Sequence, residues 1–200
     1  MTDLGRIGND VIDLLDPEIS RHHERSRFVR RVCNDSEIER LAASEDPHRL
    51  LWSLFAAKEA GFKVVAKLAP GIPFSPRRFA VDETSTRVTH DGRRLFLQVT
   101  QDHDWVHAVA RQGEGEPVWA VERRRAETGQ STAVRDLAAR LAAEHLSLAP
   151  ATLAVQREDD RRFRDDLAPP RLLCETQPLE VDLSLSHDGA WVACALLRLI

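Results

Sequence analysis

Two stretches of this chain align with each other without a gap. Residues 95–110, LFLQVTQDHDWVHAVA, match residues 181–196, VDLSLSHDGAWVACAL, and the alignment pairs Trp105 with Trp191. Each stretch reads as two β-strands joined by a polar turn, and each follows a segment with helical periodicity. A duplicated hairpin behind a helix predicts an α+β fold of two similar halves packed as a pseudo-dimer. The alternative is that two β-hairpins resemble each other by chance.

The two predicted halves, residues 1–112 and 118–200, differ in their polar residues. The first half holds a glycine–aspartate motif near its start and every lysine of the chain. The second half has His187 where the first hairpin has Gln101. A Gly- and Glu-rich break separates the halves. A duplicated fold with divided duties predicts a single active site where the two halves meet.

The remaining elements follow from periodicity and turn residues. Residues 50–67 and 131–146 repeat apolar side chains at helical spacing. A capped helix is expected after Asn34, with Glu39 as part of the cap signal. Strand-like runs bounded by turns occupy residues 7–12, 77–83, 86–90, 93–101, 104–111 and the last twenty residues or so of the chain.

All three lysines, Lys58, Lys63 and Lys67, lie in the helix predicted for residues 50–67. Glu59 precedes Lys63 by four residues, so one explanation is a surface ion pair worth about 0.3–0.5 kcal/mol. That explanation does not account for a chain that uses arginine at every other such position. Lysine is a compact charge with an adjustable pKa. We therefore interpret the helix as presenting a small cation to a phosphate or a metal.

Two short motifs near the ends of the chain carry further polar residues. In GNDVID, residues 8–13, the glycine lets another group approach the backbone, and strand alternation places Asp10 and Asp13 on opposite faces. A strand-to-helix turn capped by Asp13 would explain the same letters. In SLSHDG, Ser186 and His187 end a strand, where the imidazole can donate to a phosphate oxygen, although a structural histidine is the commoner case.

Composition excludes several classes of protein. The formal net charge of −4 gives no general nucleic-acid footprint. Three cysteines, far apart and never in C-x-x-C, argue against a disulfide framework or a zinc site and favour a reducing cytosol. The N-terminus has no apolar leader and no apolar run is long enough for a membrane span. A cytoplasmic protein without membrane or nucleic-acid partners is expected.

Together the motifs GND, FAAKEAGFK and SLSH resemble those of the 4′-phosphopantetheinyl transferase superfamily. Members typically show G-x-D, (W/F)-x-x-K-E-(A/S)-x-x-K and an S-x-S-H-type strand. The motif order is that of the short, trimeric holo-acyl-carrier-protein synthases. The chain length and the internal repeat are closer to the pseudo-dimeric members. The resemblance therefore implies a single chain that holds both halves and is a monomer.

The resemblance implies transfer of 4′-phosphopantetheine from coenzyme A to a serine of an apo acyl or peptidyl carrier protein, with release of 3′,5′-ADP. Phosphoryl transfer depends on positioning and charge neutralisation. By analogy with the family, Mg²⁺ would bind Asp10 and Glu59, with Asp13 as an optional third ligand. The implied catalytic residues are Glu59, Lys63 and Asp10.

Coenzyme A phosphates would bind Ser186 and His187 from the second half and Lys63, with Lys58 in support, from the first. Pseudo-dimeric relatives also have a GKP-like segment before the serine–histidine motif, and this chain has none. The arginines that could replace it lie in a charged loop that is otherwise explained as solvated; they are Arg162, Arg164 and Arg171, of which Arg171 is included among the candidate coenzyme A ligands.

A basic stretch, residues 21–31, offers a partner surface. It carries five arginines in a chain that is acidic overall, and opposite charge speeds encounter with an acidic carrier protein. A solvated helix face is the alternative. For the whole chain, two other functions stay open: a coenzyme A- or carrier-binding protein without transfer activity, and an unrelated Mg²⁺-dependent phosphohydrolase.

Overall fold

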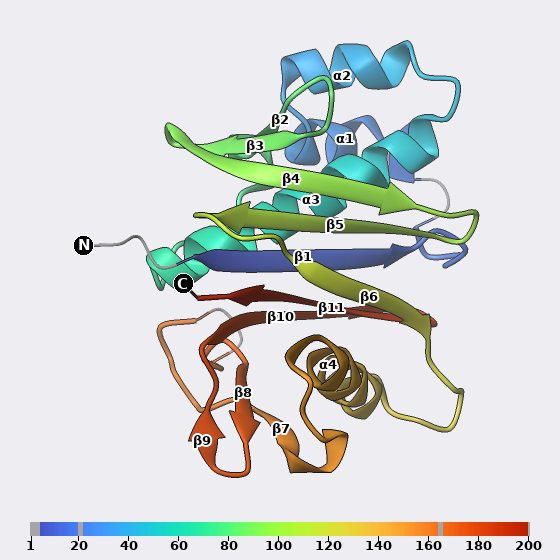
Figure 1. Cartoon of the computed structure of the whole chain (residues 1–200). Helices are drawn as coiled ribbons and strands as arrows, with labels where there is room; N and C mark the ends of the chain where they lie inside the picture. The colour runs from blue at the N-terminus through green and yellow to red at the C-terminus, as the bar shows by residue number, and fades with distance from the viewer. Residues whose placement is uncertain (1–4, 20–21, 164–165, 200) are drawn as a thin grey trace.

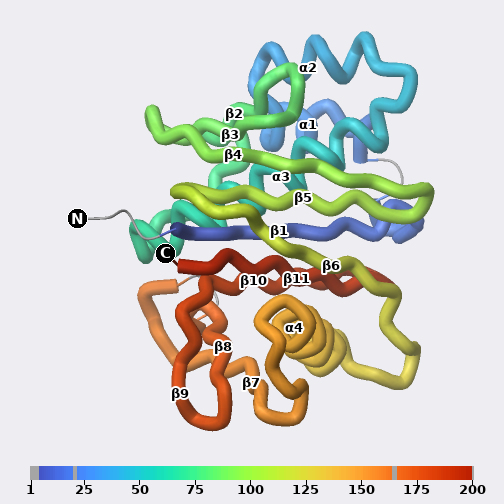
Figure 2. Tube along the Cα trace, in the orientation of Figure 1, coloured from blue at the N-terminus to red at the C-terminus, as the bar shows by residue number. Residues whose placement is uncertain are grey.

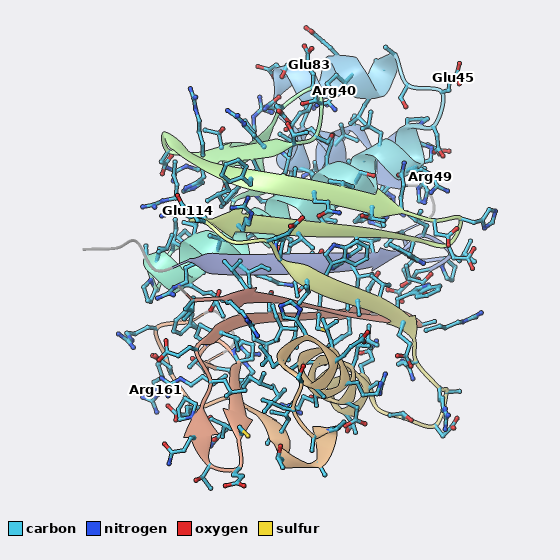
Figure 3. All side chains as sticks on the ribbon, in the orientation of Figure 1. Arg40, Glu45, Arg49, Glu83, Glu114 and Arg161 are labelled. Atoms are coloured by element: carbon cyan, nitrogen blue, oxygen red, sulfur yellow. The ribbon has the colours of Figure 1, made fainter. Side chains whose placement is uncertain are left out.

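Two layers of helix on sheet, one from each half of the chain, stack along a common seam in the computed structural model (Figure 1). The structure describes residues 5–19, 22–163 and 166–199. Charged side chains project from the outside of both halves, among them Glu45 and Glu83 in the first and Arg161 in the second (Figure 3). The predicted α+β class is confirmed.

The first half is a five-stranded antiparallel sheet covered on one face by a long helix. The strands are ordered β1-β5-β4-β3-β2 across the sheet. Their bounds are β1 Arg6–Asp13, β2 Ala80–Val81, β3 Arg87–His90, β4 Arg93–Gln101 and β5 Trp105–Gln112. The helices between β1 and β2 are η1 His22–Glu24, α1 Ser26–Val32, α2 Asp35–Ala42, α3 Pro47–Leu68 and η2 Pro76–Arg78.

Helix α3 starts earlier than its apolar pattern predicts. Asp46 caps it by accepting from the Arg49 N–H at 2.9 Å, and Pro47 occupies the first turn, where its missing N–H is not needed. The helix lies so close to β1 that a Cβ on Gly8 would stand 2.1 Å from the Ala60 carbonyl oxygen. The glycine of the GND motif is therefore required for packing.

The second half repeats this plan with fewer strands. Strand β6 (Val118–Arg123) leads into helix α4 (Gln130–Leu146), and β10 (Val181–Asp188) and β11 (Trp191–Arg198) form the hairpin of a sheet ordered β10-β11-β6. A small sheet, which the sequence reasoning did not predict, fills the connection. It consists of η3 Pro150–Thr152 followed by β7 Leu153–Gln156, β8 Arg171–Cys174 and β9 Gln177–Pro178.

Strand pairing confirms the repeat seen in the sequence. In the first hairpin Leu97 pairs with Ala110, and in the second Leu183 pairs with Leu196, the positions that the gap-free alignment equates. Strand β5 lies between β4 and β1, as β11 lies between β10 and β6. Strand β6 is thus the counterpart of β1, and the two halves are related by duplication of one α+β unit.

Each half has its own apolar core, and a third cluster joins them. Residues of α3 pack on the first sheet, and residues of α4 pack on the second. The joining cluster lies between β1 and β5 on one side and β6 and β11 on the other; it comprises Ile7, Val109, Ala195 and Leu197, with Trp119 against it. Figure 2 shows this juxtaposition as a blue strand beside red ones. We keep the division into residues 1–112 and 118–200 as a proposal.

Two smaller findings complete the fold. The cap of α2 is a capping box between Asn34 and Glu37, so the predicted cap residue is right and its predicted partner, Glu39, is wrong. Across residues 5–19, 22–163 and 166–199, no helix has both the length and the apolar character needed to cross a bilayer.

Candidate active site

The two sheets meet along β1 and β10, where side chains take the place of backbone hydrogen-bond partners. Alternate amide groups of β1 donate to side-chain oxygens of alternate residues of β10, in one unbroken register. The pairs are Ile7 to Asp182 (2.7 Å), Asn9 to Ser184 (2.9 Å), Val11 to Ser186 (3.2 Å) and Asp13 to Asp188 (2.8 Å). This seam ladder satisfies the outer edge of β1.

Two lysines of α3 reach the same seam from the helix side. Lys63 Nζ donates to the Asn9 carbonyl at 2.7 Å and to Asp10 Oδ1 at 3.1 Å. One turn further along, Lys67 Nζ donates to the Ile7 carbonyl at 2.7 Å and to Asp182 Oδ2 at 2.8 Å. The four-residue spacing of the lysines thus matches the two-residue spacing of inward carbonyls on β1. This accounts for lysine at both positions.

A cavity of about 490 Å³ opens beside the seam. Its polar wall gathers residues from all three sequence motifs, namely Asp10, Glu59, Lys63, Ser184, Ser186 and His187. Its apolar wall comes from α3, α4 and the loop before β8, and includes Phe62, Val134, Phe163, Leu167 and Pro169. The structure therefore brings together residues separated by most of the chain.

Asp10 is the most constrained acid of this pocket. Its side chain is 10% exposed, and Oδ1 accepts from Ser186 Oγ at 2.7 Å and from Lys63 Nζ. Within the described part of the chain, Oδ2 has no hydrogen-bond partner. A hydroxyl from one half and an ammonium from the other thus fix the direction of one carboxylate.

The donor set fits a hard divalent cation that shares its ligands with a substrate. No three His, Cys, Asp or Glu side chains among the described residues gather as a metal cluster. Mg²⁺ needs only one or two protein carboxylates when phosphate oxygens and waters complete its octahedron. Asp10 and Glu59 line one pocket and supply such a pair.

Ser186 and His187 differ in their surroundings. Ser186 is buried in the ladder, where it accepts from Val11 and donates to Asp10. His187 is exposed at the pocket, and partial burial together with the nearby Lys63 ammonium lowers its pKa. A neutral imidazole still offers one N–H to a phosphate oxygen.

Asp13 does not join the other two acids. Its Oδ1 accepts from the Leu15 N–H at 3.1 Å and its Oδ2 from the Ala190 N–H at 2.9 Å. A Cβ on Gly189 would lie 2.2 Å from Oδ2, so the turn between β10 and β11 closes tightly over this carboxylate. Asp13 ends β1 and anchors that turn, and the expectation of a third metal ligand is wrong.

Lys58 is also placed away from the pocket. Its side chain is 0% exposed, and Nζ donates to Glu37 Oε2 at 2.6 Å and to the Phe79 carbonyl at 2.6 Å. Burial lowers the pKa of Lys58 and the Glu37 carboxylate opposes that shift. Lys58 joins α3 to α2 and the start of β2, so it is not a coenzyme A ligand.

The arginine prediction fails for a topological reason. Arg171 lies on β8 and pairs with Glu158 at 3.5 Å, while Arg162 pairs with Asp160 at 2.7 Å, and neither lines the pocket. Arg164 lies outside the described residues. The arginines that do line the pocket are Arg135 of α4 and Arg157 after β7.

Sequence reasoning missed both of these arginines. Arg135 follows Ser131 by one helical turn and donates to its hydroxyl at 2.6 Å, so the two polar side chains share a face of α4. That spacing was the available signal. Arg157 donates to the Ala168 carbonyl at 2.8 Å and to the Leu167 carbonyl at 3.1 Å. Nothing in the sequence indicates these two contacts.

Comparison with known proteins identifies the first half. A family model described as "ACPS: 4′-phosphopantetheinyl transferase superfamily" matches residues 6–121. A holo-[acyl-carrier-protein] synthase of Azoarcus sp. (strain BH72) is 32% identical over 117 residues, which are 52% of this chain and 93% of the relative. The synthase of Aromatoleum aromaticum is 30% identical over the same lengths.

Solved structures show weaker similarity. A holo-[acyl-carrier-protein] synthase from Neisseria meningitidis is 23% identical, covers 53% of this chain and 95% of its own, and has a TM-score of 0.43. The Thermotoga maritima synthase reaches a TM-score of 0.39. Neither contributes to the assignment. Because the family match covers more than half of the chain and includes both its GND and KEA motifs, the chain belongs to the 4′-phosphopantetheinyl transferase superfamily.

Proposed function

We propose that this phosphopantetheinyl transferase moves the 4′-phosphopantetheine group of coenzyme A to a serine of an apo acyl or peptidyl carrier protein and releases 3′,5′-ADP. The observation that carries the proposal is the common pocket of Asp10, Glu59, Lys63, Ser186 and His187. Coenzyme A is an anionic nucleotide with a long, mostly uncharged arm. A pocket with one cationic wall and one apolar wall suits both parts.

The chemistry asks for little beyond positioning. The serine Oγ forms a bond to the phosphorus that carries the pantetheine arm, and the bond from that phosphorus to the bridging oxygen breaks, so that 3′,5′-ADP leaves. Glu59 accepts the serine proton, directly or through one water. Asp10 and Glu59 would hold Mg²⁺, which would neutralise pyrophosphate charge.

The remaining residues bind and orient coenzyme A. Lys63 has three N–H donors and spends two on Asn9 and Asp10, which leaves one for a phosphate oxygen. His187 offers an N–H from the opposite wall. We assign Arg135 and Arg157 to the role that a GKP-like segment plays in pseudo-dimeric relatives, since both line the pocket.

We further propose that the carrier protein docks on α1. Arg25, Arg27, Arg30 and Arg31 are exposed there, and Arg21 lies outside the described residues. Arg27→Glu should raise the KM for carrier protein about tenfold at low salt and leave the KM for coenzyme A unchanged. The difference from wild type should shrink as salt screens the charges. A salt-independent effect, or one on coenzyme A, would refute this docking site.

Two features of the proposal concern the molecule as a whole. The three cysteines are free thiols, which is consistent with a cytoplasmic location. A site made from both halves of one chain needs no second chain, so we propose a monomer. The mass in solution at micromolar concentration measures this.

Intact-mass measurement of purified apo carrier proteins incubated with coenzyme A and Mg²⁺ tests the function. The expected result is a mass gain equal to one phosphopantetheine group and an equivalent amount of 3′,5′-ADP. A chain that binds coenzyme A tightly and modifies no carrier would support the alternative, a binding protein of the same fold. Hydrolysis of coenzyme A without transfer would support a phosphohydrolase.

A further inference from the structure

Lys67 connects the three elements on which the proposed site is built. Its ammonium donates to the Ile7 carbonyl of β1 and, on β10, to Asp182 Oδ2 and the Leu183 carbonyl, at 2.7–2.8 Å. Its side chain is 7% exposed. An ammonium has three N–H donors and all three are used within the protein. Lys67 therefore has no donor left for a ligand, although it borders the pocket.

The seam ladder by itself does not fix its own register. Its two inner acceptors, Ser184 and Ser186, are identical hydroxyls. A slip of β10 by two residues, about 6.6–6.8 Å, would keep the same face toward β1 and exchange one serine for the other. Such a slip would remove Ser186 from Asp10 and carry His187 away from Glu59 and Lys63.

The ends of the ladder are different. Asp182 and Asp188 are the outer acceptors, and of these two only Asp182 has an ion-pair partner among the described residues, Lys67 at 2.8 Å. Any slip separates this pair and leaves a buried ammonium without its carboxylate, which is strongly unfavourable. The pair thus favours one register over the alternatives that the serines would permit.

We propose that Lys67 and Asp182 are positioning residues that set the register between β1 and β10, and through it the distance between the two walls of the transfer site. The inference rests on the proposed function. Lysine suits the role because a compact ammonium can donate in three directions at once, whereas the wider guanidinium fork of arginine cannot occupy the same enclosed point.

The chain contains a matched control, the buried pair of Lys58 and Glu37. It is also enclosed, with both side chains 0% exposed, and its ammonium likewise donates to backbone carbonyls. It lies within the first half, away from the seam. Loss of either pair should lower the unfolding temperature, but only loss of the seam pair should change the geometry of the pocket.

The test compares Lys67→Arg and Asp182→Asn with Lys58→Arg and Glu37→Gln, each assayed well below its own unfolding temperature. The readouts are the KM for coenzyme A, kcat, and calorimetric binding of 3′,5′-ADP. We expect Lys67→Arg to raise the KM and to weaken 3′,5′-ADP binding about tenfold, since small displacements of binding groups are costly. Asp182→Asn, which can keep its hydrogen bonds, should show about a threefold change.

The control variants should stay within about twofold of wild type in KM and binding. Wild-type KM and binding in the seam variants would overturn the inference, as would equal changes in the control variants. If Lys67→Arg does not fold, Asp182→Asn decides. A wild-type protein that binds 3′,5′-ADP but modifies no carrier would refute transfer while leaving the binding comparison valid. A wild-type protein that does not bind 3′,5′-ADP would overturn both the proposed function and the inference.

Discussion

The β1–β10 seam and the groove beside β4 occupy related positions in the two halves, yet they are built differently. Strand β6 is the counterpart of β1, and the strand registers place Ala120 where the first half has Asp10. The gap-free alignment places Phe96 where the second half has Asp182. No hydrogen bonds join β6 to β4 among the described residues, whereas four join β1 to β10.

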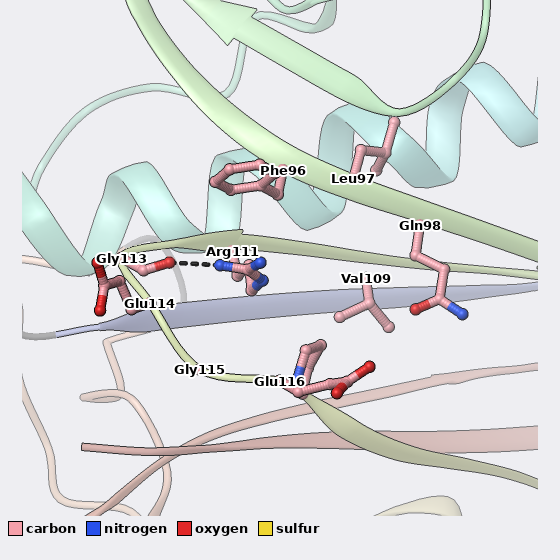
Figure 4. A pocket seen from close by; sticks show the side chains of 10 residues that line it. Phe96, Leu97, Gln98, Val109, Arg111, Gly113, Glu114, Gly115 and Glu116 are labelled. Atoms are coloured by element: carbon pink, nitrogen blue, oxygen red, sulfur yellow. Dashed lines mark hydrogen bonds between the residues drawn. The ribbon is translucent and has the colours of Figure 1, made fainter. Parts of the chain in front are cut away.

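The groove next to β4 shows what this second position has become (Figure 4). It has a volume of about 550 Å³ and is lined by β4, β5 and the segment before β6. Phe96 is 53% exposed, and the Arg111 guanidinium lies 4.3 Å from its ring centroid. The duplicated fold therefore provides two related interfaces, and only one of them has the carboxylates, lysines and hydroxyls that the proposed transfer needs.

Removing the carboxylates of the seam should have the largest effect. Asp10→Ala and Glu59→Ala should each lower kcat about a thousandfold, because charge developing on the pyrophosphate loses its neutralisation. Thermal unfolding should change little. Glu116→Ala, which removes a carboxylate from the second groove, is the control and should keep wild-type turnover. Steady-state transfer measures all three, and wild-type turnover in either seam variant would refute the assignment.

The charge at Lys63 is the next feature to test. Lys63→Arg should lower turnover about ten- to a hundredfold, or roughly 1.4–2.8 kcal/mol, since the longer fork fits poorly between Asn9, Asp10 and the substrate. Arg111→Lys in the second groove should leave turnover unchanged. The comparison uses saturating coenzyme A. Equal turnover of Lys63→Arg and wild type would mean that the ammonium serves only to join α3 to β1.

The contact between the halves should show itself in acid. His107 is 1% exposed and lies 5.2 Å, ring centroid to centroid, from Trp119 of β6. Burial lowers the pKa of His107 to about 3 from the ordinary 6.5. The unfolded chain therefore takes up a proton that the folded chain refuses as the pH falls below 6.5, and stability is lost between about pH 6.5 and 3.

At pH 5 this loss amounts to about 2 kcal/mol. His107→Gln should therefore show a free energy of unfolding that depends less on pH between 7 and 5, by about that amount. His103→Gln, at an exposed site near the start of β5, is the control and should follow wild type. Urea denaturation at both pH values measures the difference. Parallel pH dependence in His107→Gln and wild type would show that the buried imidazole is not the cause.

The smallest expected effect concerns the two hairpins. Ser186→Ala and His187→Ala should each raise the KM for coenzyme A about tenfold, as expected for loss of a hydrogen bond to a charged group. Their counterparts in the first hairpin are Thr100 and Gln101, and alanine at either should stay within about twofold. Similar KM values for all four variants would contradict the assignment of coenzyme A to the β1–β10 seam.

The sequence predicts most of the fold because duplication and helical periodicity leave strong signals. The two hairpins and the helices around α3 and α4 were identified in this way. The sheet of β7, β8 and β9 was missed, since its strands are two to four residues long and the charged loop from 157 to 171 masks them. Strand β6 was missed because its residues read as the continuation of a linker.

For the site, motif spacing indicated which side chains share a face but not what they contact. Helical spacing places Glu59, Lys63 and Lys67 together, and the pocket contains all three. It does not reveal that Lys67 is enclosed by β1 and β10, because those contacts cross more than a hundred residues of sequence. Lys58 was misassigned for the same reason, since its partner Glu37 belongs to α2.

The central claim is that one chain contains the whole site, with Asp10 from one half and Ser186 and His187 from the other. Mixing two impaired variants, Asp10→Ala and the double variant Ser186→Ala/His187→Ala, tests it most directly. At low coenzyme A concentration, the mixture should show only the sum of the two weak activities. Activity well above that sum after mixing would mean that intact sites form between chains, and would contradict the account.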